Sequence, residues 1–127
     1  MDIPPSYMAL MNCAIIIKRV KGQDGKSTRR AIVIQELKTA DNYHAAFKWE
    51  PKTDYFNPQL HDSEMLARIG DQTGLSIDEV LEEFEKRKLV LKWLSQRGVR
   101  SYDKVAEEIG RYYRDPGAMI KKIESGV

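Results

Sequence analysis

Residues 13–20 read Cys-Ala-Ile-Ile-Ile-Lys-Arg-Val, and two more runs rich in small and β-branched residues follow at residues 31–37 and 44–49. Turn-prone residues separate the runs, a pattern typical of short strands joined by hairpins. A fourth short strand is expected at Tyr55-Phe56, because Pro51 just before it suits a type I turn that folds the chain back. The first half of the chain therefore predicts antiparallel β-hairpins.

After residue 60 the apolar period changes from two to about 3.6, which indicates helices. Helix starts and stops are marked by capping residues and glycines, namely Ser63, Gly74, Ser76 with Glu79, Gly98, Ser101 and Asp115-Pro116. We therefore expect an α+β protein in two parts. Residues 1–60 would be β-rich, and residues 61–127 would form a small bundle of three or four helices.

The second of these helices is the longest, and apolar residues recur along one of its faces. The expected structural core consists of Phe84, Leu91, Trp93 and Leu94 from this helix and Ile109 from the next. Trp93 is expected in the contact between helices, where its replacement by alanine would lower the free energy of unfolding by about 3–5 kcal/mol. The alternative is an exposed Trp93 that anchors a partner.

The composition argues against several classes of function. Lys and Arg outnumber Asp and Glu by only 21 to 19, too small an excess for a nucleic-acid footprint, and no apolar run is long enough to span a membrane. The first five residues do not resemble a secretory signal, so a cytoplasmic location is expected. The single cysteine, Cys13, reads as a small buried hydrophobe.

Phosphate binding is the most tempting chemistry in the sequence. Gly25-Lys26-Ser27 resembles the end of a phosphate-binding loop, but the glycine required five positions earlier is replaced by Val20. The segment also precedes a strand, whereas a phosphate-binding loop leads into a helix. A flexible hairpin with glycine at positive φ is the preferred interpretation.

Other catalytic chemistry has even less support. The potential metal ligands Cys13, His44 and His61 have no paired spacing, and no nucleophile-elbow sequence is present. We therefore predict no catalytic, cofactor-binding or metal-binding residues.

Four residues are candidates for an interface. Arg29 and Arg30 are fork-shaped donors that suit a carboxylate or phosphate on a neighbouring subunit, although a solvated strand end explains them too. Trp49 and Tyr55 belong to an aromatic-rich hairpin that could form a docking surface or could seal the sheet against another domain.

Several segments, taken in chain order, carry a resemblance to a known family. The series Ile3-Pro4-Pro5-Ser6, residues 13–17, residues 29–37 and residues 47–56 resembles the end of the motor domain in type II secretion protein E-type ATPases, the archaeal branch most closely. Residues 76–80, 87–94 and 102–116 resemble the helical C-terminal segment of that branch.

The resemblance implies that the strands complete a RecA-like motor core and that the helices pack beside it in a hexameric ring driving secretion, pilus or archaellum assembly. The family uses ATP and magnesium, but its phosphate loop, acidic boxes and histidine box have no counterpart in these 127 residues. The expected function is a non-catalytic module that contacts the motor core, neighbouring subunits or a membrane assembly platform protein.

Two alternatives stay open. Residues 101–110 look like the first helix of a helix-turn-helix, which would make the chain a nucleic-acid-binding module, but Arg111-Tyr112-Tyr113-Arg114 continues the same helical period where a turn is needed. The chain could also be a stand-alone adaptor that docks on an intact motor ATPase.

Overall fold

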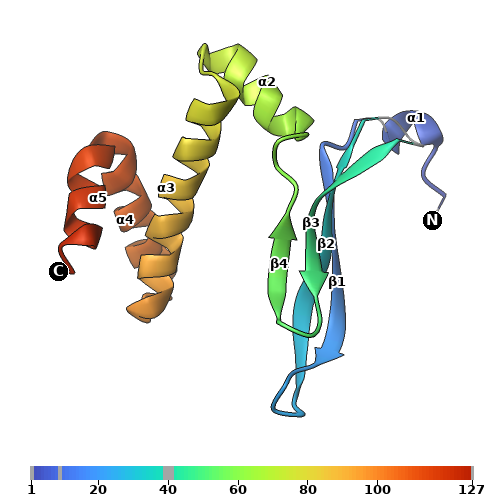
Figure 1. Cartoon of the computed structure of the whole chain (residues 1–127), viewed down its shortest axis with the longest axis horizontal. Coiled ribbons are helices and arrows are strands. Elements are labelled where there is room, and N and C mark those ends of the chain that lie inside the picture. Colours follow the sequence, from blue (N-terminus) through green and yellow to red (C-terminus); the bar gives the residue numbers. More distant parts are fainter. Residues whose placement is uncertain (1, 9, 39–41, 127) are drawn as a thin grey trace. The chain divides into compact units, whose positions relative to one another are not determined.

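The computed structural model describes residues 2–8, 10–38 and 42–126, and it is an α+β protein, as the sequence predicts (Figure 1). Its first half holds a short helix and four strands, and its second half holds four helices. In chain order the elements are α1 (Pro5–Met8), β1 (Cys13–Lys21), β2 (Ser27–Leu37), β3 (Tyr43–Glu50), β4 (Tyr55–Pro58), α2 (Glu64–Thr73), α3 (Ile77–Gln96), α4 (Tyr102–Arg114) and α5 (Pro116–Glu124).

The four strands form one antiparallel sheet in the order β1-β2-β3-β4, so β1 and β4 are its two edges. The β1–β2 hairpin pairs Lys21 with Ser27 across its turn. Gly25 in that turn has φ +75°, a left-handed conformation that suits a residue without a Cβ. The expected glycine-containing hairpin is confirmed, and the fourth strand lies where the sequence predicts it.

The chain divides into two compact units, Met1–Ile77 and Asp78–Val127, so α2 belongs with the sheet. The division falls later than the change of composition near residue 60. The reason is a buried contact between α2 and β2: the hydroxyl of Ser63 donates to Glu36 Oε1 at 2.5 Å, and the backbone N–H of Glu64 donates to Glu36 Oε2 at 3.0 Å. Ser63 also caps α2, because its Oγ accepts from the N–H of Leu66.

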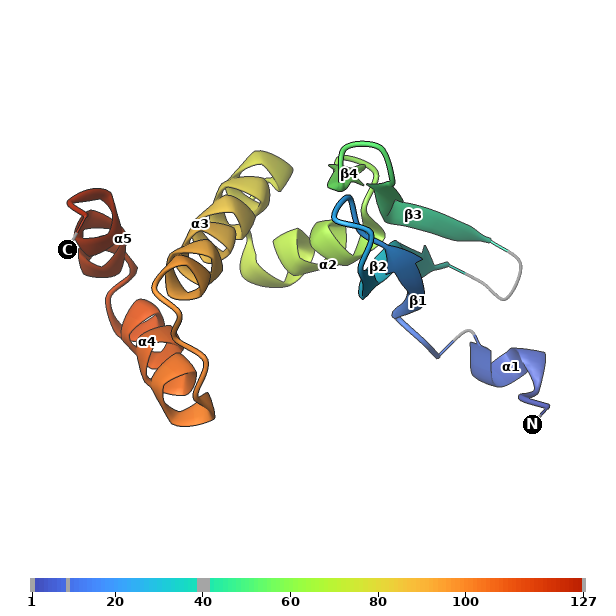
Figure 2. The ribbon, with the colours of Figure 1, turned by 90° about the horizontal axis from the view of Figure 1, so that it is seen from below.

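The second unit consists of nearly all of α3 together with α4 and α5, which lie beside the C-terminal half of α3 in both ribbon views (Figures 1 and 2). Its buried core is Val90, Leu94, Tyr112 and Met119, with partly buried apolar side chains packed around it. Asp115 caps α5 by accepting from the N–H of Ala118, and Pro116 takes the first helical position, as predicted.

The expected core residues differ in their burial. Leu94 is only 3% exposed and Trp93 packs against the buried cluster, whereas Phe84 and Ile109 are half-buried. The prediction that Leu91 lies in the core is wrong, because its side chain is 56% exposed. The helical stripe predicted from spacing is wider than the strip that α4 and α5 cover, and Leu91 lies at its uncovered margin.

Cys13 is exposed, so the prediction of a buried cysteine is wrong. The apolar run that follows it suggests a strand buried on both faces, as in sheets covered by two layers. In the structure that run lies on an edge strand. Within the described part of the chain, no helix has the length and apolar character needed to cross a bilayer.

Candidate functional site

Two of the four expected interface residues, Arg30 and Trp49, lie at the end of the sheet that carries the β1–β2 turn. Both bind Asp54, and we call these three residues the clamp. Arg30 donates from Nε to Asp54 Oδ1 and from Nη2 to Asp54 Oδ2, both at 2.8 Å. The indole N–H of Trp49 donates to Asp54 Oδ1 at 2.7 Å. Asp54 lies in the β3–β4 turn with φ +51°, a conformation that aspartate tolerates better than most residues.

The clamp changes the titration of its members. Hydrogen bonds from Arg30, and then from Trp49, hold the pKa of Asp54 well below its ordinary value. The hydrogen bond to Asp54 in turn raises the pKa of Arg30. Because its fork is used within the chain, Arg30 is not the free donor that the sequence predicts; Arg29 and Tyr55, by contrast, are exposed.

Arg29 belongs to a set of cations that sequence reasoning did not single out. We call this set the cationic hairpin; its members are Lys18, Arg19, Lys21, Lys26 and Arg29, all exposed. None of the five makes an ion pair with an acidic side chain among the described residues. The signal that could have revealed the set is local: Asp24 is the one acidic residue between positions 18 and 30.

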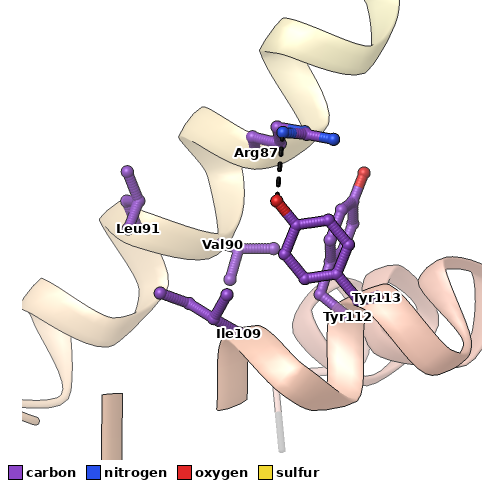
Figure 3. A pocket seen from close by; sticks show the side chains of 6 residues that line it. All are labelled: Arg87, Val90, Leu91, Ile109, Tyr112 and Tyr113. Atoms are coloured by element: carbon purple, nitrogen blue, oxygen red, sulfur yellow. Dashed lines mark hydrogen bonds between the residues drawn. The ribbon is translucent and has the colours of Figure 1, made fainter. Parts of the chain in front are cut away.

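In the second unit, an apolar groove of about 160 Å³ runs between α3 and α4 (Figure 3). Its lining residues are Arg87, Val90 and Leu91 from α3 and Ile109, Tyr112 and Tyr113 from α4. An engineered protein cavity of about 150 Å³ holds one benzene molecule, so the groove has room for about one large apolar side chain.

Arg87 and the two tyrosines are fixed at the rim of this groove. Arg87 pairs with Glu83 at 2.9 Å, donates to the hydroxyl of Tyr113 at 3.3 Å and lies over the ring of Tyr113 (Figure 3). Tyr112 donates its hydroxyl proton to Glu83 at 2.8 Å. Burial, and then the hydrogen bond to Glu83, raise the pKa of Tyr112 to about 12. Burial alone would raise the pKa of Glu83, but hydrogen bonds from Arg87 and Tyr112 outweigh it and lower that pKa.

The structure also bears on phosphate and metal binding. The Gly22–Ser27 segment joins two antiparallel strands, so it lacks the strand-to-helix geometry that points backbone amides at a phosphate. Residues 2–8, 10–38 and 42–126 contain no cluster of three or more His, Cys, Asp or Glu side chains that could hold a metal ion. Near the groove, Arg87 and Glu83 are already paired with each other. Two surfaces stand out among the described residues, namely the exposed apolar side chains of β1 and the cationic hairpin.

Comparison with known proteins gives a distant relative and no family. No family model matches the chain. An uncharacterized protein of Methanocaldococcus jannaschii, MJ0781, is 29% identical over 133 aligned positions, which cover 97% of this chain. The match spans 18% of that protein, so this chain is similar to a segment of a much longer archaeal polypeptide.

Proposed function

We propose that this chain is a non-catalytic C-terminal module of a secretion- or pilus-type motor ATPase. It packs against the motor core and contributes contacts between subunits or with assembly partners. In this proposal ATP and magnesium bind to the remainder of the motor, and we assign no residue of this chain to them.

The observation that carries the proposal is the unfinished sheet. Ile15, Ile16 and Ile17 of β1 are 56%, 39% and 61% exposed, and neighbours along a strand point to opposite faces. A strand that is apolar on both faces is typical of a sheet covered by layers on both sides. Among the described residues, no layer covers Ile15, Ile16 or Ile17 on either face, which fits a piece of a larger α/β assembly.

Two sequence comparisons agree with that view. The ordered segments of the chain resemble the end of the archaeal secretion-type motor domain, and the stretch that the M. jannaschii relative shares with this chain is 18% of that protein. The second unit has a closed core of its own, as a module appended to a motor would need.

Reconstitution tests the proposal. The M. jannaschii relative is purified complete, and also without the stretch that matches this chain. We expect the complete relative to hydrolyse ATP as a hexamer and the shortened one to lose both properties. A chimera that carries this chain in place of the missing stretch is expected to regain them. ATP hydrolysis and sedimentation velocity report the result.

Three outcomes would show that the proposal is wrong. They are a complete relative without ATPase activity, a shortened relative that is still fully active, and a chimera that folds and yet stays monomeric. The chain alone is expected to show neither ATP hydrolysis nor stabilisation by Mg-ATP. A thermal shift with Mg-ATP that disappears in Lys26→Ala would mean that the β1–β2 turn binds phosphate after all.

A further inference from the structure

The two edges of the sheet are built differently. β4 is four residues long and ends at Pro58, which has no N–H to donate, so this edge is blunted against further pairing. β1 is nine residues long, contains no proline and pairs only with β2 among the described strands. The outer side of β1 therefore presents a row of backbone N–H and C=O groups to an incoming strand.

The side chains of β1 divide this edge into an apolar half and a cationic half. Ile15, Ile16 and Ile17 fill the first half, and Lys18, Arg19 and Lys21 dominate the second. Along the alternation of the strand, Ile15, Ile17, Arg19 and Lys21 share one face, while Ile16 and Lys18 share the other. On the first face two apolar side chains are followed by two cations, whereas on the second face Lys18 lies between Ile16 and Val20.

Charged residues on an edge strand often serve only to prevent aggregation. That explanation accounts for Lys18, Arg19 and Lys21. It does not account for the two arginines, Arg29 and Arg30, on the neighbouring interior strand β2. Arg19 lies directly opposite Arg29, and Lys18 lies opposite Arg30, so two like-charge pairs face each other across the hairpin. Such pairs destabilise a sheet. Asp54 neutralises Arg30, whereas Arg29 and the β1 cations have no acidic partner within the described residues.

We propose that β1 accepts an extended segment of a partner polypeptide, whose acidic residues face the cationic half of the strand and whose apolar residues face Ile15–Ile17. Adding a strand to the edge satisfies its backbone groups, and the side chains determine which segment fits. The inference rests on the proposed function for one point, that the motor polypeptide supplies the strand.

A second copy of this chain is the simplest competing occupant. If two β1 strands paired antiparallel about Ile16, then Lys18, Arg19 and Lys21 would face Ala14, Cys13 and Met11 of the other copy. The isoleucines would meet, but the cationic hairpin would stay unneutralised. A segment with both acidic and apolar residues would neutralise the cations and also cover the isoleucines. The charges therefore favour this occupant over a second copy.

The test uses a designed, fluorescently labelled peptide with the core sequence Asp-Thr-Glu-Glu-Val-Ile-Val. In antiparallel pairing, its first acid lies opposite Lys21 and its last three residues lie opposite Ile17, Ile16 and Ile15. We expect binding by fluorescence anisotropy, together with slower amide hydrogen exchange in β1 and unchanged exchange in β4.

The double charge reversal Arg19→Glu with Lys21→Glu should weaken peptide binding by about tenfold or more, because two attractive cross-strand pairs become repulsive. The matched control reverses two exposed lysines of the second unit, Lys104→Glu with Lys121→Glu, and should leave affinity within about twofold. A peptide with lysines in place of its acids should bind the hairpin variant and not the natural chain.

Each remaining result overturns the inference. Equal affinity of the hairpin variant, or protection of β4 in place of β1, would rule out this edge as the site. Protection of β1 by dimerisation without peptide would assign the edge to a second copy. Tighter binding of anionic phospholipid vesicles or oligo-dT than of the peptide would assign the cations to a membrane or to nucleic acid.

The inference about the β1 edge and the proposed function can fail separately. If the chimera forms an active hexamer and charge reversal has no effect on it, the edge inference fails alone. If the peptide binds with the expected charge dependence and the chimera is inactive, the proposed motor function is wrong and the inference about the β1 edge stands.

Discussion

The β1–β2 hairpin and the α3–α5 unit are both rich in charge, but they use charge in opposite ways. On α3, Glu82 pairs with Lys86 and Glu83 pairs with Arg87, each one helical turn apart. On α4, Arg111 bridges both Glu107 and Glu108. In the hairpin, by contrast, Arg19 faces Arg29.

Their apolar residues show the same contrast. The helical unit encloses a buried cluster around Leu94 and Tyr112, while the isoleucines of β1 are open on both faces of the sheet. The helical unit is therefore close to complete in itself, and the sheet is not. Under the proposed function, the sheet is therefore the region expected to contact the rest of the motor.

The largest expected effect tests how closed the helical unit is. Leu94→Ala should lower the free energy of unfolding by about 2–5 kcal/mol, because it leaves a cavity in the buried cluster. Leu91→Ala makes the same chemical change one turn earlier on α3, at a side chain that is largely exposed. It should cost less than about 1 kcal/mol. Urea unfolding followed by circular dichroism compares the two, and equal losses would mean that the groove beside Leu91 is covered in solution.

The next effect concerns the attachment of α2 to the sheet. Ser63→Ala removes a helix cap and deprives the buried carboxylate of Glu36 of a donor, so it should cost about 1–3 kcal/mol. Ser101→Ala is the matched control, because Ser101 holds the equivalent position before α4 without a side-chain capping bond. That change should cost less than about 0.5 kcal/mol. Similar losses for both serines would show that the contact with Glu36 contributes little.

The elements of this fold could be predicted from local patterns. Strand and helix positions follow from turn residues, caps and periodicity, and the αL glycines Gly25, Gly74 and Gly98 all lie at predicted turns or stops. The contact of Ser63 with Glu36 could not be predicted, because the two residues are far apart in sequence and nothing local to either indicates the other. For the same reason, the sequence groups α2 with the other helices, whereas the structure groups it with the sheet.

The candidate surface was predicted less well, since its properties depend on pairing across strands. Arg29 and Arg30 look equivalent in the sequence, yet Asp54 engages only Arg30. Lys18 and Arg19 gain significance only from the register that sets them opposite Arg30 and Arg29. The burial of Cys13 was predicted wrongly because an apolar run cannot reveal whether its strand is central or at an edge.

The clamp around Asp54 provides a smaller effect, visible as a pH dependence. The folded-state pKa of Asp54 lies below its ordinary value of 3.8, so the contact contributes stability above that pH and loses it only as the pH falls through the lowered pKa. The indole N–H resonance of Trp49 should therefore keep its chemical shift from pH 7 to about pH 3. In Arg30→Gln, the carboxyl loses its main hydrogen-bond donor, and the same resonance should titrate near pH 4. A natural chain that titrates as the variant does would mean that the clamp is open in solution.

The smallest effect separates the two regions most directly, because the same kind of substitution should act with opposite sign. Arg19→Glu turns a like-charge pair with Arg29 into an attractive one, so it should stabilise the sheet by about 0.5 kcal/mol. Lys86→Glu breaks an attractive pair with Glu82 and adds repulsion on the surface of α3, so it should destabilise the helical unit by a similar amount. Thermal unfolding at low and high salt checks both signs, since screening should shrink both differences. A destabilising Arg19→Glu would mean that these cations already support the isolated fold, and the case for an acidic partner strand would lose its main observation.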